Sequence, residues 1–260
     1  ANYDSSFAAF NSSLSYAASI FMIVAALPFV RYVQLLNGDR RPLFVDTQIR
    51  VFLAIVGVLI AILTFWLVNQ QGFPVLRSIR LATFNTITII SGTGYASDDY
   101  MLWGAFPVVL LFLVGLIGGC AGSTACSIKV FRYQILFASI KAQIRRIHAP
   151  NGVFTARYEG RPIGNDVLSS VMAFFVAFIV SLGVLSVLLG LTGLDFITSV
   201  SGAATALANV GPGLGDRIGP AGNFASLNDA AKWLLAAGML IGRLELMAVY
   251  VILTLKFWRS

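Results

Sequence analysis

The chain has 260 residues, of which 58% are hydrophobic and only 11% are charged, and its mean hydropathy is +0.84. A soluble domain carries about 25% charged residues, so this composition excludes an ordinary soluble protein and indicates a membrane protein. The net charge of +7 would suit a nucleic-acid partner, but the placement of the basic residues explains it without one. Two cysteines, Cys120 and Cys126, predict neither a disulfide framework nor a zinc site, and His148 is expected to be an ordinary interfacial residue.

Five uncharged, apolar runs are long enough to cross a bilayer, which takes roughly 20 residues. Buried helices of a soluble protein are the alternative, and five such runs in one chain argue against it. We therefore expect an all-α, multi-pass integral membrane protein. The predicted spans lie at about residues 14–30, 51–68, 101–128, 167–194 and 233–255.

Two shorter stretches, Pro74–Ile89 and Asp195–Ala208, are less apolar and rich in Thr, Ser and Ala. As helices they would be about 21 to 24 Å long, which is too short for a hydrocarbon core of about 30 Å. Pro74 and Asp195 are helix-start signals, and a glycine-bearing loop follows each stretch. We predict two re-entrant helices that enter the membrane and turn back.

The basic residues fall on one side of the membrane if the five spans alternate and the short helices do not cross. Of the 18 Lys and Arg residues, 13 lie between the first two spans, between the third and fourth, or after the fifth. The positive-inside rule makes that side cytoplasmic. Residues 37–48 and 129–162 are thus expected in the cytoplasm, and residues 91–100 and 212–229 outside.

An internal repeat divides the chain. Residues 48–147 are predicted to form a span, a short helix, a loop and a span, and residues 167–260 repeat this order after a cytoplasmic linker at 148–166. Residues 1–47 match the final transmembrane helix of a preceding unit plus a cytoplasmic loop. We expect two complete pore units and the last span of a third, and hence missing pore units or a longer parent chain.

The loops after the two short helices predict an ion pathway. Irregular backbone at membrane depth is tolerated only where protein buries it or where it lines water. The carbonyl end of a half-helix favours a cation, and backbone carbonyls can replace the hydration shell of potassium, with glycine supplying the necessary backbone angles. The candidate filter residues are Ser91, Gly92, Thr93, Gly94 and Tyr95, and Ala208, Asn209, Val210, Gly211 and Pro212, with potassium expected at carbonyls near Thr93, Gly94, Val210 and Gly211.

The third predicted span has an unusual glycine-rich middle. One interpretation is a packing seam, since small residues let membrane helices approach closely. The other is a broken helix whose non-helical part lines the pore, and the length of the stretch 101–147 favours it. The residues of this candidate gate are Gly118, Gly119, Cys120, Ala121, Gly122, Ser123 and Thr124.

Arg243 lies inside the fifth predicted span, two residues before Glu245. An ionisable residue within a membrane is costly and is a functional hypothesis by default. A structural ion pair with Glu245 is the alternative, but residues two apart on a helix do not face each other well. We favour a position of Arg243 in the pore.

These segments resemble the Trk/Ktr/HKT superfamily of potassium transporters, most closely its bacterial Trk type. The resemblance runs from about residue 14 to the C-terminus, and four segments carry it: TITIISGTGY at 86–95, GGCAGST at 118–124, ALANVGPG at 206–213 and GRLE at 242–245. It implies four span–pore-helix–span units around one pore, as in potassium channels, of which this chain matches the third, the fourth and the final span of the second. It also implies that Gly94 and Gly211 are filter glycines, and that Arg243 projects into the pore near a gating loop. Cys126 departs from the glycine that is more usual there, and two units alone cannot close a fourfold filter.

The resemblance implies potassium uptake across a bacterial cytoplasmic (inner) membrane by a multi-pass protein. No enzymatic activity and no covalently bound cofactor are expected, and potassium is the transported ligand. The implied partners are the lipid bilayer, a second copy in a homodimer and a cytoplasmic nucleotide-binding regulatory subunit, for which residues 129–161 are a candidate docking surface.

Three alternatives remain open. A non-conducting fragment of such a transporter is compatible with the resemblance. A water or neutral-solute channel also combines half-helices with a pore arginine, but its half-helices begin with Asn-Pro-Ala, which this sequence lacks. A membrane-embedded enzyme would require clustered acids, histidines or a Ser/Lys pair within the spans.

Overall fold

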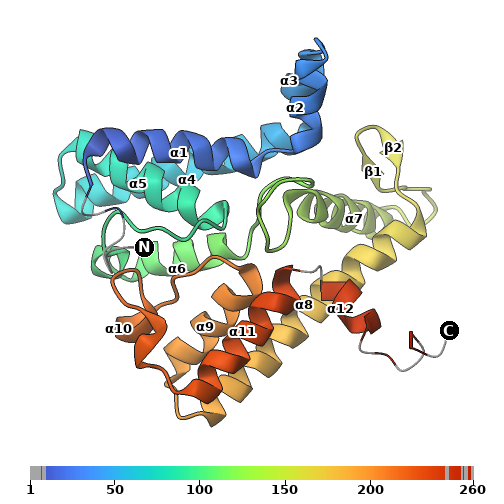
Figure 1. The fold of residues 1–260 in the computed structure, drawn as a ribbon. Coiled ribbons are helices and arrows are strands. Elements are labelled where there is room, and N and C mark those ends of the chain that lie inside the picture. The colour runs from blue at the N-terminus through green and yellow to red at the C-terminus, as the bar shows by residue number, and fades with distance from the viewer. Residues whose placement is uncertain (1–6, 8–9, 244–245, 253, 255–256, 259–260) are drawn as a thin grey trace.

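The computed structural model describes residues 7, 10–243, 246–252, 254 and 257–258. The first part of the chain forms α1 (Ser12–Ala26), α2 (Phe29–Leu36), α3 (Arg41–Val45), α4 (Thr47–Gln71), α5 (Val75–Ile90), the 3₁₀ helix η2 (Tyr100–Trp103) and α6 (Ala105–Gly115). The second part forms α7 (Val130–His148), an antiparallel hairpin of β1 (Arg157–Tyr158) and β2 (Arg161–Pro162), α8 (Asn165–Leu191), α9 (Phe196–Ala208), α10 (Gly215–Ile218), η3 (Phe224–Ser226), α11 (Asp229–Arg243) and α12 (Leu246–Ile252). In Figure 1 the blue-to-green and yellow-to-red halves form two helical groups, with the non-helical segment after α6 between them.

Two single helices of the described residues, α4 and α8, are long and apolar enough to cross a membrane. They contain 25 and 27 residues, in agreement with the second and fourth predicted spans. Along α4 the buried residues Phe52, Val56, Leu59 and Leu63 recur every three or four positions, so only one stripe faces the protein. The other side chains in the middle of α4, such as Val58 and Phe65, are apolar and exposed, which suits contact with lipid or with further apolar protein.

The first predicted span, residues 14–30, is not one straight helix. α1 ends at Ala26, and α2 leaves it at an angle of 92°. Leu27 is extended (φ −90°, ψ 160°) because the residue before a proline is disfavoured in the helical region, and Pro28 has no N–H to continue the helix. The last carbonyl groups of α1 are therefore left for partners outside the helix.

The third predicted span is interrupted as well. α6 ends at Gly115, and residues 116–129 form no helix before α7 begins. The helical structure is thus interrupted at the glycine-rich stretch. The interpretation of residues 118–124 as a helix-packing seam is wrong, because these residues are not helical.

The fifth predicted span, residues 233–255, is described in two parts, α11 and α12. α11 ends at Arg243 and α12 begins at Leu246. Residues 244–245 lie outside the described residues, so the alternative pairing of Arg243 with Glu245 is not addressed by the structure.

The two short helices begin and end close to the predicted positions. Pro74 occupies the N-terminal cap of α5, and the side chain of Asp195 caps α9 by accepting a hydrogen bond from the Thr198 N–H at 3.1 Å. α5 packs against α1 and α4, and α9 packs against α8 and α11. The last turns of both helices are buried in protein, as a helix that does not cross the membrane requires.

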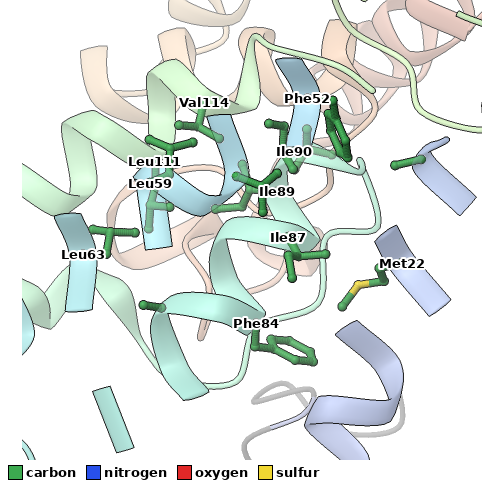
Figure 2. Packing of buried hydrophobic residues seen from close by; sticks show 14 of the residues in the cluster. Met22, Phe52, Leu59, Leu63, Phe84, Ile87, Ile89, Ile90, Leu111 and Val114 are labelled. Atoms are coloured by element: carbon green, nitrogen blue, oxygen red, sulfur yellow. The ribbon is translucent and has the colours of Figure 1, made fainter. Parts of the chain in front are cut away.

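Each short helix lies at the centre of a hydrophobic core. Figure 2 shows Phe84, Ile87, Ile89 and Ile90 of α5 among side chains of α1, α4 and α6. A second cluster surrounds α9 with residues of α8 and α11, and α9 contributes mainly small side chains such as Ala203 and Ala206. These cores fix the C-terminal ends of α5 and α9, from which the two glycine loops emerge.

Candidate functional site

The loops that follow α5 and α9 lie against each other. A Cβ atom at Gly94 would lie 1.8 Å from the carbonyl oxygen of Val210, and a Cβ at Gly211 would lie 3.6 Å from the Cα of Gly94. Both glycines have positive φ, +77° and +118°, where other residues are strained. The structure thus brings together two segments more than 100 positions apart in the sequence, and at Gly94 both the space and the backbone angle require glycine.

A buried threonine holds each loop to the last turn of its own helix. The Thr88 carbonyl accepts hydrogen bonds from the N–H groups of Thr93 (2.9 Å) and Gly94 (3.2 Å), while its Oγ1 accepts from the N–H of Tyr95 (2.8 Å).

Thr205 repeats this arrangement. Its carbonyl accepts from the Val210 N–H at 3.1 Å, and its Oγ1 accepts from the Gly211 N–H at 2.9 Å. Sequence reasoning missed both threonines. The available signal was a threonine six residues before the filter glycine in each repeat, Gly94 and Gly211.

These hydrogen bonds occupy N–H groups of the two loops, but they do not involve the carbonyl groups of the candidate filter residues. Among the described residues, no donor bonds to the carbonyl oxygens of Thr93, Gly94, Val210 or Gly211. The same four residues line an open hollow of about 280 Å³, together with Tyr95, Ala96, Pro212 and residues 218–220 and 222–224. Unpaired backbone carbonyls are strong acceptors, so this hollow suits a cation or water.

The two ends of the candidate gate loop are hydrogen-bonded to each other. The Gly118 N–H donates to the Ile128 carbonyl at 2.9 Å, and the Val130 N–H donates to the Gly119 carbonyl at 3.2 Å. A Cβ at Gly118 would lie 2.0 Å from the Cys126 carbonyl oxygen, so the two strands of the loop meet at a distance that only glycine permits. The base of the loop is therefore fixed by its own backbone.

The broken end of α1 supplies the next set of partners. The Ala26 carbonyl accepts from the Cys120 N–H at 3.0 Å, and the Ala25 carbonyl accepts from both the N–H (3.2 Å) and the Oγ1 (3.0 Å) of Thr124. In return, the Phe29 N–H donates to the Gly122 carbonyl at 3.0 Å. The loop thus satisfies carbonyl groups that the break at Pro28 left without helical partners.

Arg243 reaches the same loop from the other unit. Its Nη1 donates to the Thr124 carbonyl at 3.1 Å and contacts the Cys126 Sγ at 2.9 Å. A Cβ at Gly242 would lie 2.0 Å from the Leu207 carbonyl oxygen, so glycine allows α11 to pass close to the end of α9. The structure therefore places Arg243 in contact with the predicted gate. It also shows that Arg243 contacts Cys126, which the sequence analysis noted only because a glycine is more usual there in the family.

A cavity of about 240 Å³ lies beside this contact. It is lined by Ser123, Thr124, Ala125, Cys126, Ser127, Lys129, Arg132, Phe174, Phe178, Leu207, Gly242 and Arg243. The loop is also near the filter, since a Cβ at Gly92 would lie 3.9 Å from the Cys126 nitrogen. The two candidate filter loops, the candidate gate and Arg243 thus lie next to one another.

The two basic segments make contact with each other. Gln134 of α7 donates to the Thr47 carbonyl at 3.2 Å, which places residues from the two basic segments next to each other. Residues 93–96 and 210–212 line the hollow together with residues 218–220 and 222–224. Which end faces the cytoplasm remains a prediction.

Comparison with known proteins gives close relatives over the whole chain. The family model "TrkH: Cation transport protein" matches residues 2–258. The chain is 47% identical over 262 residues to the Trk system potassium uptake protein TrkI of Halomonas elongata, and this match covers 100% of the chain and 53% of the relative. It is 32% identical to the Trk system potassium uptake protein TrkH of Escherichia coli K12, covering 99% of the chain and 53% of the relative. The crystal structure of the potassium transporter TrkH from Vibrio parahaemolyticus superposes with a TM-score of 0.91 at 29% identity, covering 98% of this chain and 55% of that one.

The chain therefore spans about half the length of the curated relatives it matches. The expected fold class, repeated units of span, re-entrant helix and span, and the expected multi-pass location in the inner membrane agree with these matches and with the apolar helices. The relatives are named as uptake proteins, which agrees with the expectation of a transporter rather than an enzyme. Because the family model covers nearly every residue, the chain belongs to the TrkH family of cation transport proteins.

Proposed function

We propose that this chain forms two units of a potassium uptake pore and that Thr93, Gly94, Val210 and Gly211 contribute carbonyl oxygens to its selectivity filter. The observation that carries the proposal is the set of unpaired carbonyls in two glycine loops that touch each other. The names of the relatives, which are potassium uptake proteins, support potassium as the ion.

Potassium would exchange its hydration shell for these carbonyl oxygens. α5 and α9 end where the loops begin, so the partial negative charges of their C-terminal ends favour a cation there. Thr88 and Thr205 keep the loop N–H groups occupied, which leaves the carbonyls as the groups available to the ion.

The loop at 118–124 and Arg243 would control the flow of ions below the filter. The positive charge of Arg243 would repel a passing cation, and its hydrogen bond to Thr124 would hold the loop in place. Flow would require the arginine, the loop or both to move.

Two units do not enclose a fourfold pore, so this chain is proposed to conduct only together with further pore units. We also propose a homodimer in the inner membrane and a cytoplasmic nucleotide-binding regulatory subunit. The basic segment 129–161 is the proposed docking surface for that subunit, because α7 exposes Lys141, Arg145 and Arg146.

The filter assignment is tested by Gly94→Ala in the complete transporter, meaning this chain together with the pore units that it lacks. Uptake of potassium and sodium is measured in cells without other potassium uptake systems and is normalised to the amount of transporter in the membrane. We expect potassium uptake to fall by at least about ten-fold and its preference over sodium to be lost, because the added Cβ displaces the Val210 carbonyl.

Gly57→Ala is the matched control, because Gly57 lies within α4 and a Cβ there meets no atom within 4 Å. This variant should retain the uptake and the ion preference of the parent protein. An unchanged preference in Gly94→Ala would remove Gly94 from the filter.

A further inference from the structure

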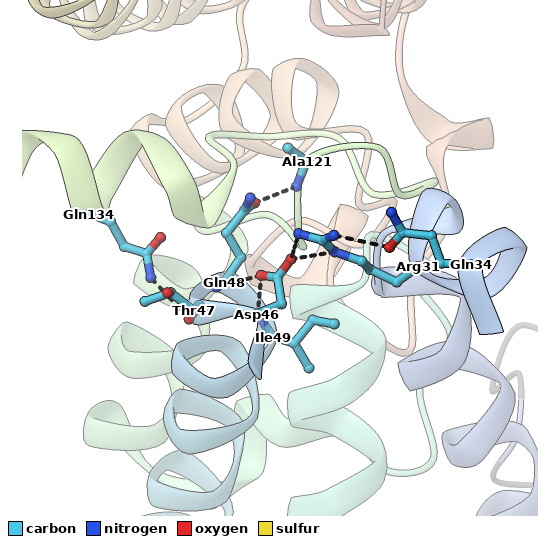
Figure 3. A network of polar contacts seen from close by, with 8 residues as sticks. All are labelled: Arg31, Gln34, Asp46, Thr47, Gln48, Ile49, Ala121 and Gln134. Carbon is cyan, nitrogen blue, oxygen red and sulfur yellow. Dashed lines mark hydrogen bonds and ion pairs between the residues drawn. The ribbon is translucent and has the colours of Figure 1, made fainter. Parts of the chain in front are cut away.

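The candidate gate loop is hydrogen-bonded to a glutamine that the sequence analysis did not single out. The Oε1 of Gln48, in the first turn of α4, accepts a hydrogen bond from the Ala121 N–H at 3.0 Å. Figure 3 shows this side chain extending from the start of α4 to the loop. The contact joins residues 73 positions apart, so a local sequence pattern could not predict it.

An ion pair between the buried Asp46 and the partly exposed Arg31 fixes the helix end that carries Gln48. Asp46 is only 5% exposed and caps α4 by accepting from the N–H groups of Gln48 (2.8 Å) and Ile49 (3.4 Å). Its Oδ2 also receives the Nε (2.7 Å) and Nη2 (2.6 Å) of Arg31 from α2. Charge-assisted bonds of this kind are short and directional, so the position of the Gln48 backbone is well determined.

The network extends to the neighbouring helices on the same side. Arg31 donates from Nη1 to the Gln34 Oε1 at 3.0 Å, and Gln134 of α7 donates to the Thr47 carbonyl at 3.2 Å (Figure 3). The start of α4 is thus tied to α2 and to α7, which follows the loop. A loop that hydrogen-bonds to this point is held by a braced part of the first unit.

The two sides of the loop are held unequally. Toward the first unit, Ala121, Gly122 and the neighbouring residues bond to Gln48 and to the backbone around the α1–α2 break. Toward the second unit, the hydrogen bond to residues 118–124 among the described residues comes from the exposed side chain of Arg243, while Ile128 at the base of the loop packs in the second core. The hydrogen bonds to the first unit therefore limit how far the loop can move when Arg243 releases it.

We propose that Gln48 is a positioning residue of the gate, which holds the Ala121 tip of the loop on the first unit and so keeps the loop beneath the filter. Asp46 and Arg31 act through it by fixing the first turn of α4. This inference rests on the proposed gating function of the loop. It assigns Gln48 no contact with the ion.

The test replaces Gln48 in the complete transporter. Gln48→Met keeps the length of the side chain but removes the acceptor, and Gln48→Leu is a second variant without an acceptor in case one of them accumulates poorly. We expect the maximal rate of potassium uptake per transporter to rise about five-fold, the factor for one ordinary hydrogen bond, with an unchanged KM for potassium and an unchanged preference over sodium.

Two further variants distinguish a positioning role of Gln48 from a general loss of protein stability. Gln48→Glu retains an acceptor in the first turn of a helix, where a negative charge is favourable, and should restore the parent rate. Gln71→Met makes the same chemical change at the other end of α4, where the glutamine donates to the Trp103 carbonyl at 3.1 Å, and it should leave the rate unchanged.

Amide hydrogen exchange of the purified transporter supplies a readout that does not depend on flow. In Gln48→Met, peptides covering 118–124 should exchange faster, while peptides covering 91–95 should not change. Faster exchange without a change in uptake would support the positioning role and contradict the proposed gate. Unchanged exchange and unchanged uptake in both Gln48→Met and Gln48→Leu would overturn the inference.

Discussion

Individual uncharged residues determine the geometry of the filter loops. Gly94 lies where a Cβ would overlap a carbonyl oxygen of the facing loop, and Thr88 binds three N–H groups of its own loop with one carbonyl and one hydroxyl. The glycine could be predicted from the sequence because its loop follows a short helix. The threonine could not be singled out, since α5 also contains Thr83, Thr86 and other polar residues that look the same in the sequence.

Thr88→Val tests the role of the threonine hydroxyl. Valine has the same shape but no acceptor, so the Tyr95 N–H is left unpaired at a cost of about 1–3 kcal/mol. We expect weaker discrimination between potassium and sodium, measured by uptake in the complete transporter, and a lower melting temperature of the purified protein.

Thr86→Val is the control for this change. Thr86 is also buried in α5, but its hydroxyl has no hydrogen-bond partner among the described residues. Its replacement should leave selectivity unchanged and stability equal or slightly higher. Equal effects of both substitutions would show that the Thr88 hydroxyl has no special role.

Interrupted helices are the elements that build the site. The break in α1–α2 and the break after α6 meet, because carbonyl groups freed at Ala25 and Ala26 accept hydrogen bonds from the loop. The glycine-rich stretch made the second break predictable, whereas the break at Pro28 was not predicted. Their pairing was not predictable, since it joins segments about 100 residues apart through backbone groups that every residue possesses. The starts of α5 and α9 were predictable because cap residues act locally.

Arg243→Ala tests the contact between α11 and the loop. If the charge of Arg243 is a barrier to the ion, its removal should raise potassium flux per transporter several-fold, with little change in the amount of protein. Arg243→Lys keeps the charge and should stay close to the parent flux. Flux is measured with a potassium-sensitive dye in vesicles containing a known amount of transporter. Lower abundance with unchanged flux per molecule would contradict the barrier and indicate a structural role.

At the scale of the whole molecule, the described residues form two helical groups that meet at the proposed filter and at the proposed gate. Each group has its own core around a short helix, and the contacts between the groups include the loops at 91–95 and 208–212, Arg243, and the packing of α6 against α9 and of α7 against α8. The repeat and the one-sided distribution of basic residues were visible in the sequence. The first span was predicted as a single helix and proved to be bent at Leu27–Pro28, because hydropathy reports where a chain is apolar and not where its backbone bends.

The central claim is that the carbonyls of the two glycine loops bind the transported ion. Its most direct test is a crystal structure of the complete transporter grown with thallium, a potassium substitute that can be located by its anomalous scattering. We predict an anomalous peak between the loops, within direct coordination distance of the carbonyl oxygens of Thr93, Gly94, Val210 and Gly211, and we predict that excess potassium abolishes it. Thallium sites elsewhere in the protein, with no peak between these loops, would contradict the claim.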